Sequence, residues 1–310
     1  MSISTPDAPL LRHTDDELAR PLPDAIRDAR ADIPAIVADI LAIPESALER
    51  DWTWIGGGET DVRYGIYRLH EVFERAEVEA AQQRRASGDS GGLSAAIIGP
   101  ATAARWTLHG LLAPLTEAEI DADPGGGEWS IRLTLGHTIS GQRAYGWSTA
   151  WWQDRGFALD DPDLPPKVSE ELFAALPDEA TTEAAGSLDD IRARLDEILD
   201  LSAERLAGMS DDRLGHGARW SGFPVPVSFR LGRWSSHIRE HTIQIEKTLA
   251  MLGRTHTEPE RLARLTLAAY GRAESVVFGQ PDADAAAGII RAAVTEARNT
   301  IADAHRAAEA

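Results

Sequence analysis

The chain has 310 residues, 43% of them hydrophobic, and a formal net charge of −19. This length suffices for one large or two modest globular domains with a buried core. The charge argues against binding to nucleic acid or to an anionic membrane, because both are negatively charged and the sequence shows no concentrated basic patch.

The absence of cysteine excludes disulfides, thiolate metal ligands and a cysteine nucleophile. Any site for a transition metal must therefore use His, Asp or Glu side chains. No stretch approaches 18 consecutive apolar residues, and the acidic, proline-containing N-terminus lacks the basic start and apolar centre of a signal peptide. We therefore expect a cytoplasmic enzyme or binding protein.

Helical patterns with short breaks make up the first part of the chain. Residues 1–23 contain several prolines and scattered charges, which indicates an arm on the surface or a partly disordered segment. Apolar residues at helical spacing predict a helix from Asp24 to the break at Pro44, and a second from about 61 to 85 that ends at a glycine-rich loop. A third helix is predicted from Leu93 to Leu112.

The middle of the chain is predicted to hold a loop, a helix and a long connection. Residues 115–128 read as a loop, after which Ser130 is a suitable N-cap for a helix that carries His137 in its middle. The segment 155–186 is rich in proline and acidic residues and predicts a long connection, with at most a short helix at 170–175.

The last part of the chain is again helical. Ser187 and Asp190 predict a helix start, residues 219–232 a loop or short hairpin, and residues 231–252 a long helix. Two further helices are predicted at 259–278 and 283–307, the first behind a capping box of Thr257 and Glu260. No strand pattern of any length is present, so the predicted class is all-α.

Two histidines, His237 and His241, lie one helical turn apart. Residues at positions i and i+4 are about 5–6 Å apart on one helix face, near enough for two imidazoles to bind one metal ion. A third ligand must come from another helix, and His137 is the best candidate, with His109 and His70 as alternatives. The open alternative is that these are core or surface histidines satisfied by hydrogen bonds.

Two motifs resemble those of the DinB/YfiT-like superfamily of metal-binding four-helix bundles. The first, W-S-x6-H, is formed by Trp129, Ser130 and His137. The second, H-x3-H followed by Q-I, is formed by His237, His241, Gln244 and Ile245. The resemblance implies a DinB-like four-helix bundle over residues 93–255, preceded by an arm (1–23) and an accessory helical pair (24–92) and followed by C-terminal helices (256–310).

The resemblance also implies a function. It predicts a divalent ion, zinc or nickel, on His137, His237 and His241, and an activity that uses a low-molecular-weight thiol such as mycothiol or bacillithiol. A metal with an open position supplies the thiolate nucleophile that a chain without cysteine lacks. We therefore expect a metal-dependent thiol S-transferase or isomerase acting on a small electrophile. The alternative function is that of a non-catalytic metal- or ligand-binding helical protein. The protein could also form a homodimer.

Further residues are candidates for the site. Glu240 and Gln244 could act in catalysis, although Glu240 points about 100° away from His241 and could instead support a ligand or lie on the surface. Trp129 and Trp234 are expected to line an apolar substrate pocket. An anionic group of a cofactor or substrate could be bound by one of three arginines, Arg143, Arg233 and Arg239, each of which could equally be a solvated helix residue.

Overall fold

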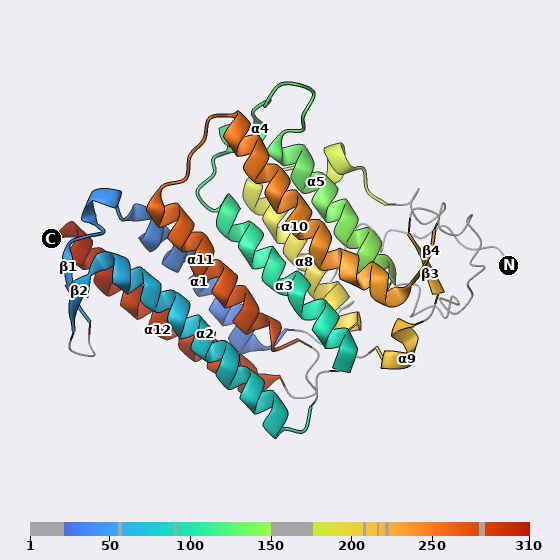
Figure 1. Ribbon diagram of the computed structural model, residues 1–310, viewed down its shortest axis with the longest axis horizontal. Helices are drawn as coiled ribbons and strands as arrows, with labels where there is room; N and C mark the ends of the chain where they lie inside the picture. Colours follow the sequence, from blue (N-terminus) through green and yellow to red (C-terminus); the bar gives the residue numbers. More distant parts are fainter. Residues whose placement is uncertain are drawn as a thin grey trace. The chain divides into compact units, whose positions relative to one another are not determined.

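The computed structural model describes residues 22–54, 58–89, 92–149, 176–206, 209–215, 217–220, 223–278 and 283–310 (Figure 1). Almost all of the expected arm, residues 1–23, and the whole of the expected short helix at 170–175 lie outside these ranges. The described residues are mainly helical, so the all-α class predicted from the sequence is confirmed.

Contacts within the chain divide it into two compact units. The described part of the first unit lies within Gly91–Ala101 and Thr116–Arg254, and the second consists of Leu22–Ser90, Thr102–Leu115 and Thr255–Ala310. Helix α3, Gly92–Leu112, contributes its first turns to one unit and the rest to the other. The candidate metal ligands all belong to the first unit.

The first unit is built around α5, Ile131–Gln142, which packs against α8, α10 and the π-helical turn η5 (Figure 1). Here α8 spans Leu188–Leu206, α10 spans Val227–Met251 and η5 spans Glu179–Glu183. A hairpin of β3, Gly217–Trp220, and β4, Phe223–Pro226, leads into α10. The unit also contains two short helices, α4 (Glu117–Asp121) and α9 (Asp211–Leu214).

Local sequence explains where these helices start and which faces they bury. Ser130 accepts a hydrogen bond from the backbone N–H of Leu133 and so caps α5, as predicted. Ser187 and Asp190 exchange hydrogen bonds at the start of α8. The apolar residues at helical spacing are buried against one another: Ile131, Leu135 and Ile139 of α5, Ile191, Leu195 and Ile198 of α8, and Leu231, Ile238 and Ile245 of α10.

The end of α5 departs from α-helical geometry. The helix continues directly into η4, Arg143–Trp147, which is one turn of π-helix. A π turn holds one residue more than an α turn, and such turns occur frequently at functional sites. Tyr145, in the middle of η4, faces the candidate site described below, whereas Trp147 is buried in the core.

The second unit combines the two ends of the described chain. Helices α1 (Asp24–Ala42) and α2 (Val62–Ala86) pack against α11 (Glu258–Ser275) and α12 (Asp284–Glu309). Their buried faces form one hydrophobic cluster. The connection from α1 to α2 contains the single turn η3 (Glu45–Ala47) and a hairpin of β1 (Asp51–Thr53) and β2 (Glu59–Asp61). The expected accessory pair and C-terminal helices thus lie in the same unit.

A charged group lies in the core of the second unit. Glu274 is fully buried and accepts hydrogen bonds from Arg30 (2.7 Å), Arg105 (2.7 Å), Trp106 (3.0 Å) and Tyr270 (2.7 Å). Burial by itself would raise the pKa of Glu274, but the charges of Arg30 and Arg105 outweigh it and lower the pKa to about 2. The carboxylate is therefore ionised at neutral pH and joins α1, α3 and α11.

Some elements were not expected from the sequence. The β1–β2 hairpin has strands of only three residues, too short to show an alternating pattern, whereas the β3–β4 hairpin coincides with the loop or short hairpin predicted at 219–232. The short helix α4 lies within the expected loop 115–128, although Thr116 and Glu119 form a capping box there. Among the described residues, no helix combines the length and apolar character needed to cross a bilayer.

Candidate metal centre and ligand cavity

The three candidate ligands lie together in the first unit. Helix α5 supplies His137 and α10 supplies His237 and His241, and their ligand atoms all lie within 4.8 Å of one another. The Nε2 atoms of His237 and His241 are 3.0 Å apart, and the His137 ring centroid is 5.2 and 4.8 Å from those of the other two. Among the described residues this is the one His/Asp/Glu group that could hold a metal ion.

Neighbouring side chains fix the orientation of two of these imidazoles. Glu179 of η5 is 2.9 Å from Nδ1 of His137, and the side-chain oxygen of Gln244 is 2.8 Å from Nδ1 of His241. Each oxygen accepts a hydrogen bond from a ring in the Nδ1–H tautomer, which leaves Nε2 with a free lone pair. Such partners hold metal-binding histidines in place and raise their basicity.

Gln142 has the corresponding position beside His237. Its amide nitrogen is 3.5 Å from Nδ1 of His237, and its buried amide oxygen has no hydrogen-bond partner in the described part of the chain. The same amide nitrogen donates to the backbone carbonyl of Thr138 at 3.3 Å, which fixes the orientation of the Gln142 side chain beside His237.

Gly141 provides the space that His237 fills. A Cβ atom at this position would lie 2.5 Å from Nδ1 and 3.0 Å from Nε2 of His237, and closer still to Cε1. Only a residue without a side chain therefore lets the imidazole rest against the backbone of α5. The glycine places a ligand from α10 next to the helix that carries His137.

Burial keeps the imidazoles of α10 neutral. The pKa of His237 is lowered to about 3, first by burial and then by the nearby imidazoles, and the pKa of His241 is lowered for the same leading reason. The hydrogen bond with His137 lowers the pKa of Glu179, which is therefore an anion at neutral pH. Neutral imidazole is the form that binds metal.

These observations fit a divalent transition metal. Zinc–nitrogen bonds of about 2.0–2.1 Å place adjacent ligand nitrogens roughly 3–3.5 Å apart, and the Nε2 atoms of His237 and His241 are 3.0 Å apart. The donor set is nitrogen only, which suits zinc or nickel better than calcium or magnesium. Three protein ligands leave at least one coordination position open.

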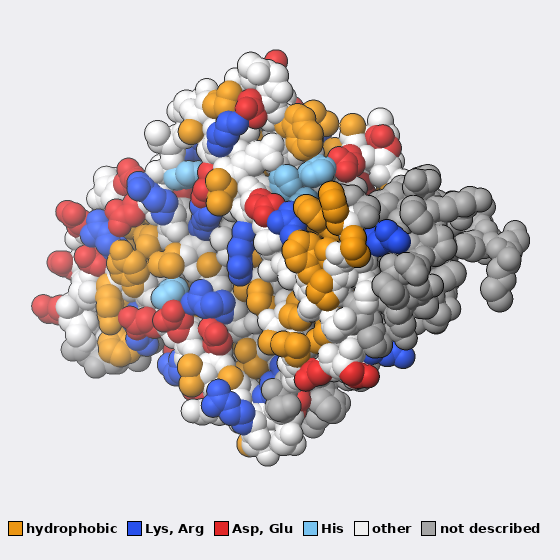
Figure 2. Space-filling view, turned by 45° about the vertical axis from the view of Figure 1, so that its right-hand side comes forward, with side chains coloured by type: hydrophobic (Ala, Val, Ile, Leu, Met, Phe, Trp, Pro, Cys, Tyr) orange, Lys and Arg blue, Asp and Glu red, His pale blue; other side chains and the backbone are white. Residues whose placement is uncertain are grey.

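A cavity of about 530 Å³ lies beside the three imidazoles, all of which line it. Seven other lining residues bear polar or aromatic groups: Ser140, Tyr145, Glu179, Trp220, Arg230, Arg233 and Glu240. The side chain of His137 is 31% exposed, so the centre opens to solvent. Histidine side chains are visible at the molecular surface in Figure 2, next to acidic and basic side chains.

Arginines and aromatic rings form one wall of this cavity. Arg233 pairs with Glu240 at 2.8 Å, and its guanidinium carbon lies 5.9 Å from the ring centroid of Tyr145 and 5.8 Å from that of Trp220. Trp220 Nε1 donates to the Tyr145 hydroxyl at 2.9 Å. Arg230 is buried and donates to Thr149 Oγ1 at 3.3 Å and to two backbone carbonyls.

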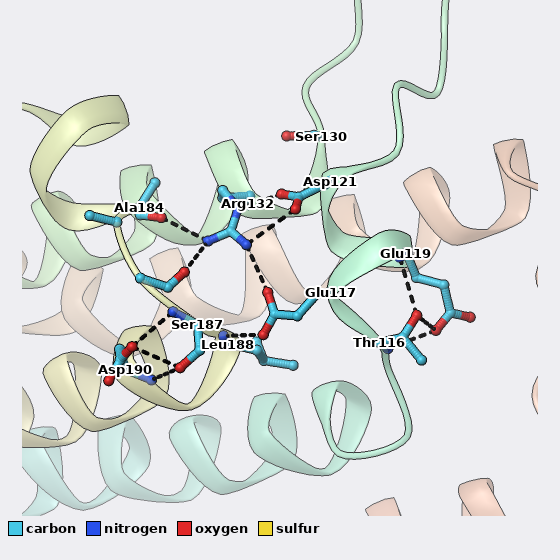
Figure 3. Close-up of polar contacts among 12 residues, drawn as sticks. Thr116, Glu117, Glu119, Asp121, Ser130, Arg132, Ala184, Ser187, Leu188 and Asp190 are labelled. Atoms are coloured by element: carbon cyan, nitrogen blue, oxygen red, sulfur yellow. Dashed lines mark hydrogen bonds and ion pairs between the residues drawn. The ribbon is translucent and has the colours of Figure 1, made fainter.

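A polar cluster outside the cavity holds α5 in position (Figure 3). Arg132, the second residue of α5, donates to the Ala184 carbonyl at 3.0 Å and to Glu117 of α4 at 2.8 Å. The other carboxylate oxygen of Glu117 accepts from the backbone N–H of Leu188, where α8 begins, at 2.7 Å. The cluster ties α4, α5 and the start of α8 together, and it therefore helps to fix His137 relative to η5.

The structure brings some of the predicted site residues to the cavity or into contact with its histidines. Glu240 lines it, Gln244 contacts His241, and Trp129 packs edge-on against His137 with the ring centroids 5.2 Å apart. Arg233 is at the cavity wall, whereas Arg239 is exposed and does not line it.

Two predicted residues lie elsewhere. Arg143 is buried and paired with Glu183, and Trp234 is fully buried in the core; neither lines the cavity. The alternative ligands also lie apart from the cluster, since His109 packs against Trp106 and His70 belongs to α2, both in the second unit. The expectation that Arg143 and Trp234 bind a ligand in this cavity is therefore withdrawn.

Several residues of the site were not singled out from the sequence. Glu179 comes from a proline- and acid-rich segment with no pattern that points to a site. Tyr145 and Gln142 lie near the predicted helix end, and Trp220 and Arg230 lie in or next to the predicted loop or hairpin. Only the positions of Gln142 and Tyr145, five and eight residues after His137, could have indicated from the sequence that these two residues lie near the site.

Comparison with known proteins identifies one family. Residues 101–245 match the model of the DinB superfamily. No curated protein and no solved structure shows a significant match. The matched segment contains α5, α8 and most of α10, including all three histidines of the cluster. Residues 101–245, a little under half of the chain, are therefore similar to the DinB superfamily.

Proposed function

We propose that the protein binds a divalent transition metal through His137, His237 and His241 and transfers a low-molecular-weight thiol to a small electrophile. One observation carries the proposal: three imidazoles from two helices converge beside a cavity, and a side-chain oxygen lies at hydrogen-bond distance from Nδ1 of two of them, His137 and His241. Zinc and nickel suit this nitrogen donor set.

The metal and the protein have separate tasks. A divalent ion held by the three histidines would supply a Lewis acid that lowers the pKa of a bound thiol. The chain holds the ligand atoms neutral and oriented, and it shields His237, which is only 6% exposed, from water. Arg230 and Arg233 attract an anionic ligand to the same cavity.

Tyr145 is the candidate for handling a proton. Its hydroxyl oxygen accepts a hydrogen bond from Trp220 Nε1, and its ring lies 5.4 Å from that of His237. The phenolic proton therefore remains available for donation to a ligand or leaving group in the cavity. In the transfer the thiol loses its proton, sulfur bonds to the electrophilic carbon, and the leaving group departs with the bonding pair and a proton.

Metal content tests the first part of the proposal. Untagged protein should contain zinc or nickel in a near-stoichiometric amount, measured by elemental analysis. His137→Ala and His237→Ala should lose it, whereas His70→Ala, a histidine substitution in the second unit, should keep it. A wild-type protein that neither contains nor takes up a transition metal would refute the proposal.

Thiol transfer tests the second part. Metal-loaded protein is incubated with mycothiol or bacillithiol and the electrophile monochlorobimane, and the fluorescent adduct is followed over time. The rate should exceed that of His237→Ala by at least 100-fold, with circular dichroism showing that the variant is folded. Equal rates in a protein that binds metal would instead support the alternative of a non-catalytic metal- or ligand-binding protein.

A further inference from the structure

We infer that Arg233 binds a carboxylate group of the ligand that enters the cavity, with Glu240 as its counter-ion in the free protein. The inference rests on the proposed function, because it assigns a substrate class to the same cavity. It predicts that the ligand carries a carboxylate a few bonds away from the atom that lies near the histidines.

The spacing along α10 sets the geometry. Arg230, Arg233, His237 and His241 all line the cavity, at helical intervals of three, four and four residues. With a rise of 1.5 Å per residue, Arg233 begins about 6 Å and Arg230 about 10 Å before His237 along the helix axis. A small molecule can therefore reach the histidines at one end and a guanidinium at the other.

Arg233 is preorganised for this task. Its guanidinium lies against the rings of Tyr145 and Trp220, and its buried Nε has no hydrogen-bond partner among the described residues. A planar guanidinium held in this way offers two parallel N–H groups to a carboxylate, a geometry that an ammonium group cannot match. The Nε–H group is one that a ligand could satisfy.

The present partner of Arg233 is exchangeable. The side chain of Glu240 is 52% exposed and that of Arg233 is 22% exposed, so Glu240 is the partner that can turn into solvent. A ligand carboxylate in the cavity can therefore displace it.

The start of α10 supplies an independent argument. The helix has no acidic residue in its first turn and no side-chain N-cap, yet Arg230 lies at the end of its first turn. Cations at this end oppose the helix dipole, which favours negative charge there. Arg230 is buried, and although burial lowers its pKa to about 10, it remains a cation at neutral pH. An anionic ligand would offset this unfavourable arrangement.

Binding of paired probes tests the inference. Isothermal titration of zinc-loaded protein gives the Kd of 3-mercaptopropionate and of its neutral amide, which differ only in the anionic group. The wild type should bind the acid about tenfold more tightly than the amide, as expected for one hydrogen-bonded charge pair. Arg233→Met should abolish this preference and leave the Kd of the amide within twofold.

Three further variants serve as controls. Arg239→Met removes an exposed arginine of the same helix that does not line the cavity, and it should keep the tenfold preference. Glu240→Gln should tighten binding of the acid, because the competing carboxylate is gone. Arg233→Lys keeps the charge without the planar fork and should give an intermediate preference, which covers the case that Arg233→Met does not fold.

The outcomes separate this inference from the proposed function. Equal affinities of zinc-loaded wild type for acid and amide would overturn the role of Arg233 and leave the metal site intact. Zinc-loaded protein that binds neither probe would overturn both. If the wild type takes up no zinc, the proposed function fails, and the comparison of propionate with propionamide on the metal-free protein still decides the role of Arg233.

Discussion

Replacing Gly141 by alanine should damage the metal centre while leaving every proposed ligand in the sequence. The added Cβ would lie 2.5 Å from Nδ1 of His237, whereas ordinary contact begins near 3.4 Å. The ring must therefore withdraw by roughly 1 Å, and metal–ligand distances tolerate only about 0.2 Å. We expect the affinity for zinc to fall by at least about 100-fold.

The same change alters the free energy of unfolding in two opposite ways. Alanine in a helix is more favourable than glycine by about 0.5–1 kcal/mol, but overpacking against a buried ring costs about 1–3 kcal/mol. The metal-free variant should therefore be less stable by up to about 2.5 kcal/mol. With zinc at 1,000 times the wild-type Kd, binding stabilises the wild type by about 4.1 kcal/mol and a 100-fold weaker variant by only about 1.4 kcal/mol.

Urea unfolding with and without zinc, together with a chelator competition for Kd, measures both effects. Gly232→Ala is the matched control, because Gly232 lies in α10 with no atom within 4 Å of an added Cβ. It should stabilise the protein by about 0.5–1 kcal/mol and leave the Kd for zinc unchanged. Wild-type zinc affinity in Gly141→Ala would refute the claim that this glycine seats His237.

Three more predictions follow from contacts described above. Glu179→Gln removes the charge that holds His137 and should weaken zinc binding about 10–100-fold in a competition titration; unchanged affinity would contradict this role. Arg143→Met leaves the buried Glu183 without its main partner and should lower the free energy of unfolding by about 3 kcal/mol, with the Kd for zinc of the folded variant within twofold. Glu274 has a folded-state pKa of about 2 against a usual 4.5, so it contributes about 3 kcal/mol to the free energy of unfolding above pH 4.5, and this contribution is lost as the pH falls toward 2. Glu274→Gln should therefore make the free energy of unfolding depend less on pH between 4.5 and 2. An unchanged dependence would show that other groups cause it.

The sequence predicted the long helices well because their signals are local. The N-cap at Ser130 and the capping box of Thr257 and Glu260 mark the starts of α5 and α11, and apolar spacing marks the buried faces. The sequence also predicted the three clustered histidines, because two helical motifs define their positions: His137 in the first, and the i, i+4 pair His237 and His241 in the second. Their role as metal ligands stays a prediction that the experiments above test.

The surroundings of the histidines could not be read from the sequence. Glu179 reaches His137 across 42 residues, and a contact at that separation depends on the fold. Trp234 lies near the face of α10 that bears His237, but this helix is buried on more than one side. Periodicity therefore predicts that Trp234 is buried, but it does not distinguish a residue in the hydrophobic core from one that lines the cavity. Arg143 follows α5 directly, where the π turn changes the register.

The π turn after Gln142 divides the helix beside the cavity into two parts. His137 lies before the turn, and Tyr145 lies within it. Loss of one residue there would restore α-helical geometry and rotate Tyr145 and everything after it in that helix by about 100°. His137 would keep its place. A single-codon deletion would thus change the residues that line the cavity while the three histidines keep their positions.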